Sequence, residues 1–185
     1  MNRSTLTKIH LLLAAFIFPV ALMFLVTGGL YTWGFKGSYE EQLYDVNLDS
    51  PLVAEQSDLQ AIVERELKLR SIGFPSGGAK IKKIGPSFQL EWTGSRRDVM
   101  LAPTHRPLVA KLVVKETTWY RNLVQLHKAK GGQLFKVYAA VLAISLFVIL
   151  ASGSLMAWQV PKYRRMASIA AAAGVGSFLV AIMFS

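Results

Sequence analysis

The apolar residues of this 185-residue chain are gathered into three long blocks. No charged side chain occurs in the 27 residues between Lys8 and Lys36 or in the 25 residues between Lys136 and Lys162, and 166–185 is also uncharged. About 20 apolar residues in a helix cross a bilayer core, where backbone N–H and C=O groups must pair within the segment. The pattern predicts transmembrane helices at 9–34, 134–159 and 166–185.

The first block follows two basic residues, Arg3 and Lys8, as the apolar part of a secretory signal peptide would. Its uncharged run is far longer than the roughly 7–15 residues of a signal peptide's apolar region, and no A-x-A cleavage site follows it. We therefore expect this block to be a retained membrane anchor.

Residues 35–118 have the patterning of a small folded domain outside the membrane. Ser57 and the polar residues after it have the form of a helix-capping signature. Apolar residues then recur at helical spacing on one face: Leu59, Ile62, Val63 and Leu67. Gly73 and Pro75 predict the end of this helix.

Short runs of alternating apolar and polar residues, separated by turns that contain Gly or Pro, predict strands after this helix. The expected strands cover 79–84, 88–92, 99–101 and 108–114. The predicted fold is therefore a membrane α-helical protein with an inserted α+β domain, in which one helix lies on a three- or four-stranded antiparallel sheet. We expect 119–133 to lie along the membrane surface as a lead-in to the second span.

The charges are distributed unevenly. All 11 acidic residues lie between Glu40 and Glu116, whereas 1–8 and 160–165 carry only basic charges. Short loops rich in Lys and Arg stay in the cytoplasm, and longer domains cross regardless of charge. We expect a bacterial inner-membrane protein with a cytoplasmic N-terminus, and with the domain and the C-terminus in the periplasm. These topology signals and the lipid bilayer explain the net charge of +10, so no nucleic-acid partner is expected.

The composition also limits the chemistry. The chain has no cysteine, which excludes disulfides, thiolate metal sites and Fe–S clusters. Neither a Ser-His-Asp arrangement nor the ligand spacing of a metal site is present. We therefore predict no catalytic residue and no metal site, and the sequence favours a protein that is not an enzyme.

Four short motifs mark the ends of the first two spans: Lys8-Ile9-His10-Leu11, Thr27-Gly28-Gly29-Leu30, Gln125-Leu126-His127-Lys128 and Ser152-Gly153-Ser154-Leu155. In this order the chain resembles the PepSY-associated transmembrane family, in which an outward-facing PepSY domain is inserted between two spans. The chain departs from the family pattern at Ala102–Pro107, where the hairpin lacks the usual Asp and Gly. It also has three predicted spans, whereas the better-studied relatives have four or more.

The resemblance raises haem as a cofactor, because some larger relatives bind haem through paired transmembrane histidines and reduce ferric siderophores. His10 and His127 are the candidate ligands here. The predicted topology puts them near opposite membrane surfaces, on the order of 30 Å apart, so they would not share one haem. Haem binding would then need pairing across a homodimer or a histidine from another subunit. Otherwise both are interfacial residues bonded to headgroups or helix ends, and His105 is a surface turn residue.

Two sets of residues are candidates for partner binding. Small residues in the third span would let another helix approach closely: Ala170, Ala172, Gly174 and Gly176. Lys80 and Lys82 share one face of a strand, which is either a solvated face that discourages edge pairing or a docking site for anionic lipid or an acidic partner.

Together these features favour a non-enzymatic accessory or regulatory subunit that binds other membrane protein subunits, with a homo-oligomer as one form of that association. The alternative is a haem-binding redox protein in iron or siderophore handling. A third hypothesis, implied by the PepSY resemblance, is that the outer domain restrains a protease.

Overall fold

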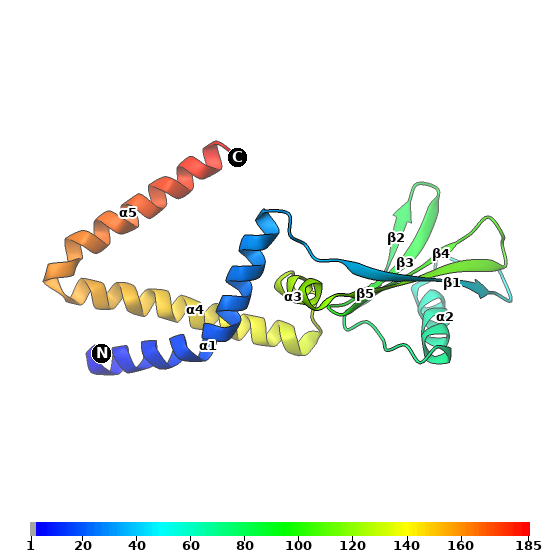
Figure 1. The fold of residues 1–185 in the computed structure, drawn as a ribbon, viewed down its shortest axis with the longest axis horizontal. Helices are drawn as coiled ribbons and strands as arrows, with labels where there is room; N and C mark the ends of the chain where they lie inside the picture. The colour runs from blue at the N-terminus through cyan, green and yellow to red at the C-terminus, as the bar shows by residue number, and fades with distance from the viewer. Residues whose placement is uncertain (1–2) are drawn as a thin grey trace. The chain divides into compact units, whose positions relative to one another are not determined.

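The structure, a computed structural model, describes residues 3–185. Figure 1 shows the order of its helices and strands along the chain. The chain divides into two compact units. One comprises the chain up to Ala21 together with Ala140–Ser185, and the other comprises Leu22–Ala139.

Three helices of the described chain are long and apolar enough to cross a membrane, and they lie where the sequence predicts the three spans. They are α1 (Arg3–Thr32), α4 (Gln133–Gln159) and α5 (Pro161–Met183). Helix α5 begins five residues before the predicted third span. The proline at its first position has a backbone suited to starting a helix, and the basic residues after it are also helical. Hydropathy locates the part of a helix that fits lipid, and the helix itself continues beyond it.

The inserted domain contains a five-stranded antiparallel sheet in the order β1-β5-β4-β3-β2. Its strands are β1 (Tyr39–Asn47), β2 (Ala79–Ile84), β3 (Ser87–Thr93), β4 (Arg97–Pro103) and β5 (Val109–Thr117). Strands β2 to β5 follow one another as a meander. The first strand pairs with β5 along its whole length, from Tyr39 opposite Thr117 to Asn47 opposite Val109. The sequence analysis missed β1, which has few apolar residues.

Helix α2 (Gln56–Leu69) covers one face of this sheet, and the two share the apolar core (Figure 1). The predicted core face of the helix is confirmed, since Leu59, Val63 and Leu67 are fully buried. The predicted cap is wrong. The helix begins at Gln56, and the Ser57 hydroxyl donates to the Glu55 carboxylate instead of to the backbone.

Two leucines near the end of α2 test this packing. Leu67 is 0% exposed, whereas Leu69 is 73% exposed. We expect Leu67→Ala to lower the free energy of unfolding of the domain by about 2–5 kcal/mol, because it leaves a cavity in the core. We expect Leu69→Ala to change it by less than about 0.5 kcal/mol. Urea unfolding of the full chain in detergent, followed by tryptophan fluorescence, measures both, and equal losses would contradict the described face of α2.

Candidate functional site

His127 is the last residue of α3 (Trp119–His127), and its imidazole lies against the C-terminal part of α1. Its Nδ1 is 2.8 Å from Oγ1 of Thr27, a residue only 2% exposed. The Phe24 ring lies 4.7 Å from the imidazole, centroid to centroid. A Cβ atom added to Gly28 would be 3.1 Å from the imidazole Cε1. The hydroxyl therefore holds the ring, and the glycine next to it leaves the space that the ring occupies.

His10 has the same surroundings on a different pair of helices. It lies in α1, and its Nδ1 is 2.9 Å from Oγ of Ser152 in α4, a residue 3% exposed. A Cβ added to Gly153 would be 3.6 Å from the His10 Cε1. In both places an imidazole rests on a buried hydroxyl followed directly by a glycine.

The hydroxyls decide which imidazole nitrogen carries the proton. Thr27 Oγ1 donates its single hydrogen to the Met23 carbonyl at 2.6 Å, and Ser152 Oγ donates to the Ile149 carbonyl at 3.0 Å. When each hydroxyl donates to its carbonyl in this way, it accepts from the histidine, and Nδ1 of each ring is then the N–H donor. In a neutral imidazole this leaves Nε2 with a free lone pair.

Nε2 is the ring atom of both histidines that is available to a ligand, since it makes no hydrogen bond to another described residue. It can accept a hydrogen bond or ligate a metal ion. A ligating histidine almost always donates its other N–H to a fixed acceptor, and the two hydroxyls supply that acceptor here. The sequence identified both histidines as candidates but did not predict these partners on other helices.

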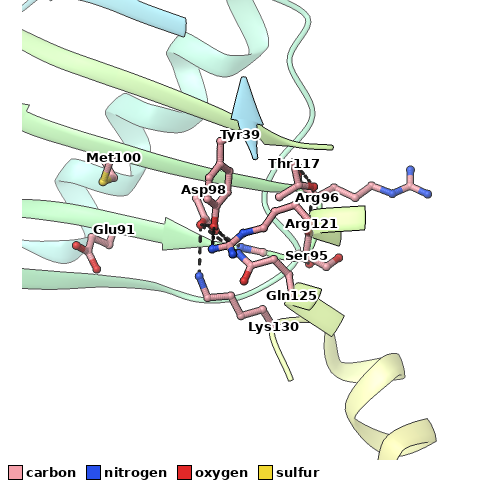
Figure 2. Close-up of polar contacts among 12 residues, drawn as sticks. Tyr39, Glu91, Ser95, Arg96, Asp98, Met100, Thr117, Arg121, Gln125 and Lys130 are labelled. Carbon is pink, nitrogen blue, oxygen red and sulfur yellow. Dashed lines mark hydrogen bonds and ion pairs between the residues drawn. The ribbon is translucent and has the colours of Figure 1, made fainter. Parts of the chain in front are cut away.

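Helix α3 is fastened to the sheet through a second polar cluster, which centres on the carboxylate of Asp98 (Figure 2). This side chain is 8% exposed in strand β4. Its Oδ2 accepts from Gln125 Nε2 at 3.4 Å, Lys130 Nζ at 3.3 Å and the Tyr39 hydroxyl at 3.3 Å. Arg121 Nη2 donates to the same tyrosine hydroxyl at 2.9 Å. Residues from β1, β4 and α3 thus share one buried carboxylate.

The small residues predicted for partner binding are all exposed along α5, a helix with no buried residue. Successive helical residues are rotated by about 100°, so Ala170 and Gly174 form one stripe, and Ala172 and Gly176 form another roughly 160° away. The sequence analysis treated them as a single face. No other part of the described chain lies within 4 Å of where a Cβ would stand on Gly174 or Gly176.

The predicted lysine pair lies on the edge strand β2, where Lys80 and Lys82 are both exposed. Lys82 Nζ pairs with Oε1 of Glu91 on β3 at 3.2 Å. Burial alone would raise the pKa of the Glu91 carboxyl, but hydrogen bonds from Gln89 and Lys82 and the charges of Lys82 and Lys80 together lower it. One of the two lysines is therefore already engaged within the sheet, and partner binding by this pair stays a prediction.

The chain matches no protein-family model, no curated protein and no solved structure. The PepSY resemblance drawn from the motifs therefore stays a prediction. Within residues 3–185, no group of three or more His, Asp or Glu side chains is placed to hold a metal ion.

Two substitutions at one buried position test the hydrogen bond from His127 to Thr27. We expect Thr27→Val to destabilise the chain by about 1–3 kcal/mol, because it leaves a buried imidazole N–H without an acceptor. Thr27→Ser keeps the hydroxyl and should retain most of the stability. Thermal unfolding in detergent measures both variants, and an equal loss would show that the methyl group rather than the hydroxyl matters.

Adjacent glycines provide a second check. Alanine in place of glycine favours a helix by about 1 kcal/mol at either position. At Gly29 nothing lies within 4 Å of the added Cβ, whereas at Gly28 the His127 ring must move. We expect Gly28→Ala to be less stable than Gly29→Ala in the same thermal assay. Equal stability would contradict the close approach of the imidazole.

Proposed function

We propose that this chain is a non-enzymatic accessory or regulatory protein of the bacterial inner membrane, with a periplasmic PepSY-like domain, that binds a partner membrane complex. The observation that carries the proposal is the exposure of α5, which has no buried residue among its 23 positions. The other two spans bury side chains within the described chain, including Leu6 and Ile17 of α1 and Ser145 of α4.

The composition of α5 supports association through this helix. Lipid tails are as apolar as leucine, so membrane helices associate through close packing and polar contacts instead of hydrophobic burial. The stripes at Ala170 and Gly174 and at Ala172 and Gly176 let another backbone approach on either side. Two narrow stripes on one helix suit a helix inserted between two neighbours, which are subunits of a partner complex or second copies of this chain.

The outer domain supports a regulatory role in the same proposal. The Asp98 cluster links α3 to strands β1 and β4 by hydrogen bonds. A partner that binds the sheet and shifts these strands would therefore also shift α3. On this proposal the domain senses or binds a periplasmic partner, and α3 carries that contact toward the span that follows it.

Single cysteines in this cysteine-free chain test the role of α5. Gly174→Cys lies in a small-residue stripe, and the adjacent Val175→Cys is the matched control. We expect thiol cross-linking in native membranes to give one defined product from Gly174→Cys, with a partner or a second copy, and little from Val175→Cys. Equal and diffuse cross-linking at both positions, with the chain purifying alone, would contradict the proposal.

A second candidate function, haem-based redox chemistry, is favoured by the two imidazoles with Nδ1 donated and Nε2 free. When bound, haem would supply one-electron transfer, and His10 and His127 would each offer Nε2 to hold it. The buried hydroxyls of Ser152 and Thr27 would hold the rings in the ligating orientation.

Absorption spectra separate the two candidates. If haem is bound, the detergent-purified chain shows a Soret band that His10→Ala or His127→Ala abolishes or shifts, while His105→Ala leaves it unchanged. A chain expressed with ample haem that shows no Soret band is not a haem protein.

A further inference from the structure

A cavity of about 350 Å³ lies between the outer end of α1 and helix α3. Its lining comes from these two helices and the residue after α3: Thr27, Gly28, Tyr31, Thr32, Val124, His127 and Lys128. The cavity therefore lies near the end of the uncharged run of α1, a few residues before Lys36. Such a position is where a membrane span meets the lipid headgroups.

Lys128 lines this cavity, and a second ammonium group, that of Lys36, lies near the Tyr31 ring of the cavity lining. Lys36 Nζ lies 5.5 Å and Lys128 Nζ 5.7 Å from the centroid of the Tyr31 ring. Neither lysine forms an ion pair with a carboxylate in residues 3–185, and the nearby Asp98 is paired with Lys130. All acidic residues of the chain lie between Glu40 and Glu116, and none occurs in α1 or α3. This positive charge suits an anionic ligand.

The imidazole adds a second requirement. His127 lines the cavity, and its Nδ1–H is donated to Thr27, so Nε2 offers only a lone pair. A phosphate oxygen cannot satisfy a lone pair, whereas a hydroxyl group can donate to it. A ligand that carries both an anionic group and a hydroxyl meets both requirements. It must also partition into a membrane, because the cavity lies beside a membrane span.

We propose that this cavity binds an anionic phospholipid whose headgroup carries a free hydroxyl, of the phosphatidylglycerol type. The phosphate lies between the ammonium groups of Lys36 and Lys128, and a glycerol hydroxyl donates to His127 Nε2. Gly28 and Val124 form an apolar surface against which the acyl chains of the lipid pack. A phosphatidylethanolamine headgroup is disfavoured because it has no net charge, and its own ammonium group would repel the two lysines.

Native mass spectrometry of the full chain in detergent tests the charge requirement. Phosphatidylglycerol and phosphatidylethanolamine with identical acyl chains are titrated, and we expect tighter binding of phosphatidylglycerol. Each lysine near an anionic headgroup contributes about fivefold in affinity, so Lys36→Gln with Lys128→Gln should weaken phosphatidylglycerol binding about 25-fold. The matched control, Lys83→Gln with Lys111→Gln, removes the same charge from two exposed positions of the sheet and should leave binding unchanged.

The hydroxyl requirement is tested with phosphatidylmethanol, which has the same charge and no free hydroxyl. We expect the wild-type chain to prefer phosphatidylglycerol about fivefold, the effect of one hydrogen bond. His127→Phe keeps a ring and should abolish this preference, while Lys36→Arg with Lys128→Arg keeps the charge and should preserve binding. Soluble glycerol phosphate should bind far more weakly, because it lacks the acyl stem.

Three results would overturn the assignment. They are equal affinity for phosphatidylglycerol and phosphatidylethanolamine, equal loss of binding in the two double-glutamine variants, and no preference of the wild-type chain for phosphatidylglycerol over phosphatidylmethanol. A Soret band lost in His127→Phe would also overturn it, because haem would then occupy the nitrogen that the glycerol hydroxyl requires.

Discussion

Two hydrogen bonds between a histidine and a buried hydroxyl join α1 to the helices α3 and α4. In apolar surroundings an imidazole N–H without a partner is costly, and neither Thr27 nor Ser152 has a hydrogen left to donate once its own helix carbonyl is satisfied. With each hydroxyl donating to its own helix carbonyl, Nδ1 donates and the hydroxyl accepts. This pairing also fixes which turn of α1 faces α3 and which turn faces α4, because dispersion between apolar side chains is far less specific than a hydrogen bond.

A glycine follows each hydroxyl, and the one beside His127 is the more confined. A methyl group on Gly28 would press on the imidazole of His127, and one on Gly153 would touch that of His10. A hydroxyl residue followed by glycine thus forms a site against which an imidazole ring packs. This pair of residues occurs once in α1 and once in α4. The histidine at each of these sites comes from a different helix. Helix α1 supplies the hydroxyl for His127 of α3, and it supplies His10 for the hydroxyl of α4.

The sequence predicted the features that depend on local pattern. Charge-free runs located all three membrane helices, and periodic leucines located the buried face of α2. Strand β1 was missed because its residues are mostly polar and its place is decided by pairing with β5, about 70 residues away. His10 and His127 could be singled out as the only histidines near the spans. Their partners could not, since Thr27 and His127 are separated by 100 residues and hydropathy carries no information on which helices meet.

The same contacts shape the functional account. Because Nδ1 is used for structure, Nε2 remains for a ligand, and in His127 it lines a cavity flanked by two lysines without carboxylate partners. The Asp98 cluster joins the sheet to the helix that carries His127, so the outer domain and this cavity share α3. Helix α5 remains available to other subunits. These features are the basis of the proposals that the chain binds lipid and partner proteins, with Nε2 of each histidine available to a ligand.

The most direct test is ¹⁵N NMR of the chain labelled at its three histidines and reconstituted in lipid, because the nitrogen shifts report which ring atom holds the proton. The signals are assigned with single substitutions of each histidine. The account predicts that His10 and His127 are neutral rings protonated on Nδ1, and that Thr27→Val alters the signal of His127 alone. Rings protonated on Nε2, or a His127 signal unchanged by loss of the Thr27 hydroxyl, would contradict it.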